Sequence, residues 1–272
     1  MLDILKFMET CSPITQTLIG TTYLWIMTAA GAATVFLPKK IDRKMLGGLL
    51  GFAGGVMLAA SFWSLLLPAI EVSRINDVPV WMPVLIGFST GAVFLWGIDK
   101  ALIRFENGYP FKSLKNGDAK HSINMLFIGI TLHNIPEGLA IGVAFASAAA
   151  GIHPASLAGA ILLTIGIGIQ DLPEGIAVSM PLYGEGMSRL RSFWYGQITG
   201  FVEVLAGLVG AATIFISLSL LPYVLGFAAG AMVYIVVEEI IPESKKMSDS
   251  KIPTIGFMIG FAVMMLLDVA FS

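Results

Sequence analysis

Eight stretches of the sequence are apolar over about 20 residues, the length that a helix needs to cross roughly 30 Å of hydrocarbon. Because backbone N–H and C=O groups must be satisfied internally in a bilayer, each stretch predicts a transmembrane helix. Composition agrees: only 12% of the residues are charged, against about 25% in soluble domains. We therefore expect an all-α, polytopic protein of the cell membrane, with one transmembrane domain over residues 1–272. The predicted spans are 13–37, 46–70, 79–99, 122–147, 155–181, 193–218, 221–242 and 253–271.

The basic residues predict how these spans are oriented. Of the 16 lysines and arginines, all except Lys6 and Arg74 lie in the connections after the first, third, fifth and seventh spans. By the positive-inside rule these four connections are cytoplasmic, so both termini lie outside. The connection over 100–121 is the only long polar one, and we expect a mobile cytoplasmic loop there.

Charge and cysteine content exclude several classes of function. The net charge of −2 leaves no basic surface for nucleic acid. Cys11 is the single cysteine, so neither an internal disulfide framework nor a thiolate metal cluster can form.

The fourth and fifth spans are each interrupted by one polar phrase, HNIPEG from His133 and QDLPEG from Gln170. Carboxylates inside a membrane span are costly unless another group offsets their charge, and every lysine and arginine lies near a loop or a helix end. Spacings of three and four residues place the polar side chains of each phrase on one helix face. The two helices run in opposite directions, so an axis in the membrane plane would relate the phrases and bring them together near the midplane.

Metal coordination is the interpretation that best accounts for this pattern. Imidazole, carboxylate and amide oxygen suit a borderline divalent ion such as Zn²⁺, or Cd²⁺, Fe²⁺ or Mn²⁺. One alternative is that the phrases only kink the helices and that their carboxylates are protonated. Another is a proton relay through the same carboxylates. The candidate ligands in the two phrases are His133, Asn134, Glu137, Gln170, Asp171 and Glu174.

Three further polar or sulfur-bearing residues lie well inside predicted spans. Glu203, in the sixth span, is interpreted as a further ligand, against a lone protonated acid. Met57, in the second span, is by its residue type more often a packing residue than a ligand. Ser64, two turns farther along the same face, is ordinarily a helix-packing hydroxyl.

Acidic residues also lie near the ends of three spans. Asp268, near the outer end of the last span, is either a surface carboxylate or part of an entrance. Glu238 and Glu239, near the inner end of the seventh span, form either a solvated cluster or an exit relay for cations. Asp99, at the inner end of the third span, admits the same two interpretations.

The phrases HNIPEG, QDLPEG and EEIIPE (the last from Glu238) together resemble the ZIP family of divalent-metal transporters, most closely its GufA-like branch. The resemblance implies a 3+2+3 arrangement, with the first and last three helices as inverted repeats around the central pair, and a binuclear metal centre. It implies Ser64 and Asp268 at an outer entrance, and Glu238, Glu239 and Asp99 at an inner exit. The implied first site contains Met57, His133, Glu137, Gln170 and Glu174. The implied second site contains Asn134, Glu137, Asp171, Glu174 and Glu203.

The sequence also departs from the family pattern. Val204 follows Glu203 where proline is expected in this branch, and Glu238 occupies a position that can be histidine in relatives. The polar loop has one histidine, His121, where many relatives have several, which puts metal capture by the loop in doubt.

We therefore expect a transporter that imports Zn²⁺ into the cytoplasm by alternating access, with an elevator-like movement implied by the resemblance. The ion is the substrate, and the lipid bilayer is the other partner. The alternatives are a metal-selective channel and an intramembrane metalloenzyme. We expect no enzyme, because no HExxH motif occurs and the ligands are spread over at least three helices. Faces rich in small residues permit a homodimer and do not require one.

Overall fold

The computed structural model describes residues 2–37, 42–74, 78–104, 117–152, 155–184, 186–216, 218–248 and 250–271. Over these ranges all regular structure is helical, and eight spans are long and apolar enough to cross a membrane. The all-α, multi-pass fold predicted from the sequence is thereby confirmed. Most of the loop predicted over 100–121 lies outside the described residues, since α5 runs to Arg104 and α6 begins at Gly117.

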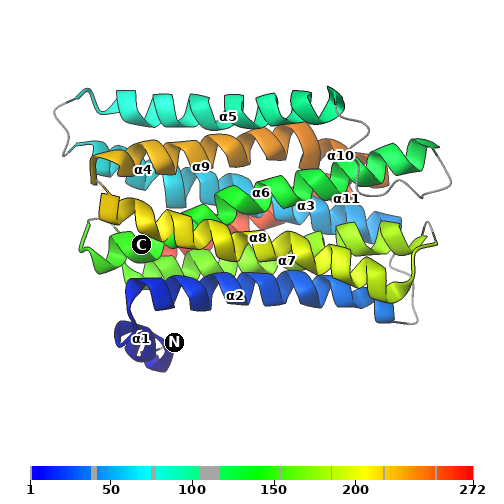
Figure 1. The fold of residues 1–272 in the computed structure, drawn as a ribbon, viewed down its shortest axis with the longest axis horizontal. Coiled ribbons are helices and arrows are strands. Elements are labelled where there is room, and N and C mark those ends of the chain that lie inside the picture. The colour runs from blue at the N-terminus through cyan, green and yellow to red at the C-terminus, as the bar shows by residue number, and fades with distance from the viewer. Residues whose placement is uncertain are drawn as a thin grey trace.

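Most spans are single helices, but the second and seventh are each built from three segments (Figure 1). In both, a π-helical segment precedes an α segment with proline in its first turn, Pro68 or Pro242. The helices are α1 (Leu2–Glu9), α2 (Pro13–Ala32), η1 (Ala33–Phe36), α3 (Arg43–Ala60), η2 (Ser61–Leu66), α4 (Leu67–Ser73), α5 (Trp81–Arg104), α6 (Gly117–Ala149), α7 (Leu157–Gly184), α8 (Arg189–Ile216), η4 (Leu218–Leu220), α9 (Leu221–Ile235), η5 (Val236–Ile240), α10 (Ile241–Met247) and α11 (Ile252–Phe271).

The spans run back and forth along one axis, and both chain termini lie at the same end of the bundle, on the left of Figure 1. We call this the outer end and the opposite one the inner end, after the predicted orientation. The orientation and the 3+2+3 arrangement themselves stay predictions.

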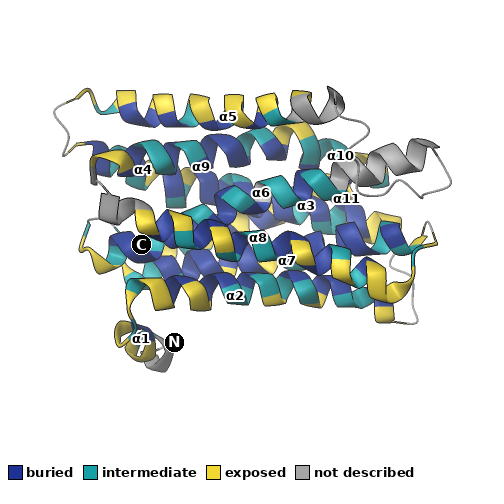
Figure 2. Cartoon of the chain, in the orientation of Figure 1, coloured by how far each residue is buried: buried dark blue, intermediate teal, exposed yellow. Residues whose placement is uncertain are grey.

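Helix α7 forms the centre of the bundle. In its most apolar window 78% of the residues are buried, against 28% in the third span and 17% in the last. Figure 2 shows the exposed face of α5. Helix α2 packs against α7 and α8, α6 against α8, and α3 against α11. Most of the central helix is therefore buried and can carry polar side chains, and Ile165 and Ile169 are its exposed apolar residues in this window.

Candidate metal centre

Both polar phrases lie inside continuous helices. Pro136 is within α6 and Pro173 within α7, and neither proline ends its helix. Asn134 and Glu137 are 0% exposed, as are Gln170, Asp171 and Glu174. The helical repeat therefore directs these side chains into the interior of the bundle, as their spacing predicts.

Three carboxylates from the two helices converge. Glu137 of α6 and Asp171 and Glu174 of α7 each offer an oxygen atom, and these oxygens lie within 4.8 Å of one another. The Gln170 Nε2 atom donates a hydrogen bond to Glu137 Oε1, which joins the phrases across the helix interface. The structure thus brings together residues that are 33 positions apart in the sequence.

Glu203 reaches the same region from α8 because α6 and α8 approach closely at Gly138. A Cβ atom at position 138 would lie 2.7 Å from the Cα atom of Glu203 and 2.9 Å from the Cβ atom of Ala206. Only glycine allows this approach without a shift of one helix. Glu203 is itself 0% exposed, so a fourth carboxylate joins the buried set.

Several oxygen atoms of the buried carboxylates have no hydrogen-bond donor and no cation beside them over the described residues. Over the described ranges, both side-chain oxygens of Asp171 and of Glu203 lack a hydrogen-bond partner, as does the Asn134 amide. The buried side chains of those ranges include four carboxylates and no lysine or arginine. Isolated buried carboxylates are strongly destabilising, so the arrangement suits a bound cation whose ligands are carboxylate and amide oxygens.

For two predicted ligands of the first site, the structure gives no contact with this cluster over the described residues. Met57 of α3 is 0% exposed and belongs to the main apolar core. His133 lies in α6, but its side chain is outside the described residues. Their roles as ligands stay predictions.

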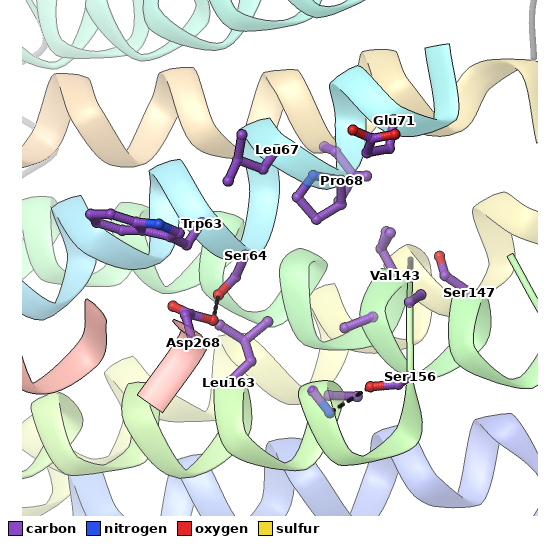
Figure 3. A pocket seen from close by; sticks show the side chains of 15 residues that line it. Trp63, Ser64, Leu67, Pro68, Glu71, Val143, Ser147, Ser156, Leu163 and Asp268 are labelled. Atoms are coloured by element: carbon purple, nitrogen blue, oxygen red, sulfur yellow. Dashed lines mark hydrogen bonds between the residues drawn. The ribbon is translucent and has the colours of Figure 1, made fainter. Parts of the chain in front are cut away.

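The predicted entrance residues meet at the outer end. Ser64 Oγ of η2 donates a hydrogen bond of 2.7 Å to Asp268 Oδ1 of α11. Both side chains line a pocket of about 440 Å³ that lies between η2, α11, α6 and α7 (Figure 3). Sequence reasoning missed Glu71, which also lines this pocket and forms an ion pair of 3.2 Å with Arg74. Its position seven residues after Ser64, two turns along the same helix, is the signal that could have identified it.

Two of the three predicted exit residues, Glu238 and Glu239, lie in η5, in the inner half. Glu239 is half-buried and faces α6, where a Cβ atom added at Gly129 would lie 3.0 Å from its Oε1 atom. Glu238 is exposed. Asp99 lies in α5, and its side chain is outside the described residues.

Comparison with known proteins matches this chain to zinc transporters. A family model described as ZIP Zinc transporter matches residues 112–268. The chain is 38% identical to the zinc transporter ZIP11 of Homo sapiens, across 95% of this chain and 98% of that protein. It is 33% identical to the zinc transporter GufA of Myxococcus xanthus, across 89% and 94% of the two chains. The zinc transporter ZupT of Chlorobium limicola is 32% identical, with 88% and 91% covered.

Proposed function

Because this chain belongs to the ZIP family of zinc transporters, and is a multi-pass membrane protein rather than an enzyme, we propose that it imports Zn²⁺ into the cytoplasm through the buried carboxylate centre. Divalent-metal transport follows from the family. The direction, the binuclear centre and alternating access are the parts that we propose.

One observation carries the proposal: four fully buried carboxylates share the interior with no buried lysine or arginine over the described ranges. A divalent cation would neutralise this charge and fill the acceptor atoms that lack partners. In the proposed first site the ligands are Met57, His133, Glu137, Gln170 and Glu174. In the proposed second site they are Asn134, Glu137, Asp171, Glu174 and Glu203, so Glu137 and Glu174 would bridge two ions.

The proposed path begins in the outer pocket, where Asp268 and Ser64 would hold the hydrated ion. A six-coordinate aqua ion occupies about 180 Å³, taking roughly 30 Å³ for each water, so a pocket of about 440 Å³ accommodates it. The ion would lose water as it reaches Glu137 and Asp171. Movement of one helix bundle against the other would then open the centre towards Glu239 and Glu238, with Asp99 near the inner end of the path.

The test is uptake of ⁶⁵Zn into proteoliposomes by the parent chain and by Glu137→Ala and His133→Ala. Both variants are expected to reduce uptake to near background, because each removes a ligand of the ion. Glu9→Gln is the matched control, since it removes one carboxylate that is exposed on α1. Unchanged uptake in both ligand variants would disprove the proposal.

Glu203→Gln tests the division into two sites. We expect bound zinc, measured by elemental analysis of purified protein, to fall from two ions per chain to one. Glu203 is a ligand of the second site alone, so the first ion should remain. Loss of both ions would show that the two ligand sets are wrongly divided.

Zinc dependence of uptake separates a transporter from a metal-selective channel. Uptake that saturates and slows steeply on cooling fits alternating access, because each ion requires a conformational change. Uptake that stays linear with zinc concentration would favour the channel. Competition by Cd²⁺, Fe²⁺ and Mn²⁺ in the same assay would rank the metals at this mixed nitrogen and oxygen site.

A further inference from the structure

The first two turns of α3, the end of α10 and the start of α11 meet at one corner of the inner end. A Cβ atom added at Gly47 of α3 would lie 3.3 Å from the Met247 Cβ atom and 3.4 Å from Pro253 Cγ. One added at Gly48 would lie 2.8 Å from the Cγ2 atom of Ile252. Residues that are about 200 positions apart in the sequence are therefore neighbours here. We call this region the α3–α10–α11 corner.

Basic side chains gather around these contacts. All are exposed, and they flank the packed residues in sequence on all three segments. They are Arg43, Lys44, Lys245, Lys246 and Lys251.

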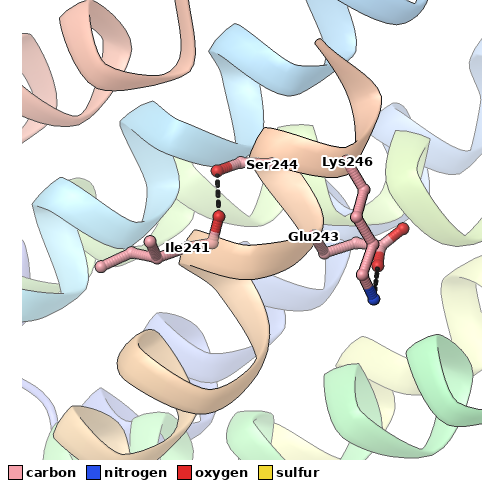
Figure 4. Close-up of polar contacts among 4 residues, drawn as sticks. All are labelled: Ile241, Glu243, Ser244 and Lys246. Carbon is pink, nitrogen blue, oxygen red and sulfur yellow. Dashed lines mark hydrogen bonds and ion pairs between the residues drawn. The ribbon is translucent and has the colours of Figure 1, made fainter. Parts of the chain in front are cut away.

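Over the described residues, the corner has fewer acidic than basic side chains. Lys246 Nζ forms an ion pair of 3.2 Å with Glu243 (Figure 4). Asp42 caps α3 by accepting a hydrogen bond of 3.4 Å from the Lys44 backbone N–H. Asp249 lies outside the described residues. The corner thus has five basic and two acidic side chains over the described ranges.

The start of α11 adds hydroxyl groups and a helix dipole. Ser250 Oγ accepts from the Ile252 backbone N–H at 3.3 Å and is 2.6 Å from Ser248 Oγ. The first turn of α11 contains no acidic residue, so the positive end of its dipole is not neutralised there. Helix N-termini beside basic and hydroxyl groups are suited to phosphate.

Two apolar side chains of the corner are exposed. Met45 is 54% exposed and Ile252 is 42% exposed, and each is adjacent in sequence to basic residues of the corner. The basic residues could therefore bind the charged headgroup of a lipid, and the neighbouring apolar residues could contact its acyl chains. A free phosphate ion would use only the basic residues. Clusters of four to eight basic residues next to transmembrane helices are typical of sites for anionic lipids.

We propose that the α3–α10–α11 corner binds the phosphate of an anionic phospholipid, with the acyl chains against Met45 and Ile252. That this lipid belongs to the inner leaflet follows from the proposed orientation of the chain. The binding itself does not depend on that orientation. Such a lipid would tie α3, α10 and α11 together at the membrane surface. Because no residue of the corner is among the proposed zinc ligands, lipid binding can be measured separately from zinc transport.

The test measures binding of phosphatidylglycerol and phosphatidylcholine to the purified full chain in detergent, by native mass spectrometry and by thermal stability. The variant Lys44→Gln/Lys251→Gln removes two charges from the corner. Its matched control, Lys100→Gln/Arg191→Gln, removes two charges from other parts of the inner end. At about 1 kcal/mol for each basic residue near the surface, we expect the corner variant to bind phosphatidylglycerol roughly 20- to 30-fold more weakly.

The parent and the control should keep the preference for phosphatidylglycerol and its stabilising effect. Equal binding of the two lipids by the parent would overturn the proposal. Equal losses in the two double variants would overturn it as well, because binding would then reflect diffuse surface charge. An inorganic phosphate arm gives the third decisive result: stabilisation equal to that by phosphatidylglycerol would show that the corner binds the free anion. Normal ⁶⁵Zn uptake alongside any of these failures would leave the transport proposal standing.

Discussion

The outer and inner halves of the bundle are packed differently beside the carboxylate centre. On the outer side, the pocket reaches Val143 of α6, six residues and about 9 Å along the helix from Glu137. On the inner side, an apolar cluster from α3, α6 and α7 fills the space instead. Its buried members are Leu46, Leu50, Ile130, Ile176, Ala177, Val178 and Leu182.

This difference teaches that a pocket approaches the centre from the outer side, whereas on the inner side a buried apolar cluster follows the centre directly. The inner cluster begins at Ile176, two residues after Glu174, and continues to Leu182. Under the proposed mechanism, these contacts are the ones that must separate before zinc leaves. We infer that the conformation described here is closed to the inside.

Cysteine labelling should give the largest contrast between the halves. Cys11 is the single cysteine, so single-cysteine variants can be made on a Cys11→Ser background. A charged thiol reagent added to the purified protein in detergent, where it can reach both ends of the bundle, should modify Ser156→Cys, which is exposed and lines the pocket. Modification of Ala177→Cys, which is 0% exposed, should be about 10- to 1,000-fold slower if its site opens only in a minor state populated at 0.1–10%. Equal rates would show that the inner half is open.

Truncation of one leucine in each half should separate their packing energies. Leu50→Ala leaves a cavity in the inner cluster, where Leu50 is 0% exposed, and should cost about 2–5 kcal/mol of stability. Leu163→Ala, its matched control, enlarges a pocket that already exists and should cost clearly less. Denaturation of the purified variants measures both. A larger loss from Leu163→Ala would contradict the difference in packing.

The side on which acid is applied should matter for uptake. Proposed ligands must be deprotonated to bind metal, so protons compete with zinc, and uptake should fall as pH falls. Because the outer side has the pocket, lowering the external pH from 7.5 to 5.5 should reduce initial ⁶⁵Zn uptake several-fold, and the same change inside the vesicles should reduce it less. An equal or larger effect of internal acid would argue against loading from the outer pocket.

Asp268→Asn should give the smallest effect, confined to the outer half. The amide can still accept a hydrogen bond from Ser64, but it loses the charge that would attract the ion. We expect KM for zinc to rise a few-fold with little change in kcat, as for a residue that acts before the ion reaches the centre. Glu9→Gln again controls for loss of one negative charge at the outer end. A large fall in kcat would mean that Asp268 takes part in a later step.

Local sequence patterns were sufficient for the helices and for the polar faces of the two phrases. Helical spacing alone predicted that Glu137 and Glu174 share faces with their neighbouring amides. Three features escaped prediction: the pocket lined by Glu71, the π-helical segments η2 and η5, and the inner apolar cluster. Each depends on which helices become neighbours, and a pattern of apolar residues within one span does not encode that choice.

The sequence by itself determined that the chain has eight spans apolar enough to cross a membrane and that carboxylates lie inside them, because apolar spans and polar interruptions can both be recognised along the chain. Only the tertiary structure decided that Glu137, Asp171 and Glu174 offer oxygens within 4.8 Å of one another and that Glu203 is buried beside α6. The physical reason is close packing. Contacts such as that of Gly138 with the Glu203 backbone set the distances between helices, and these distances determine which carboxylates can share an ion.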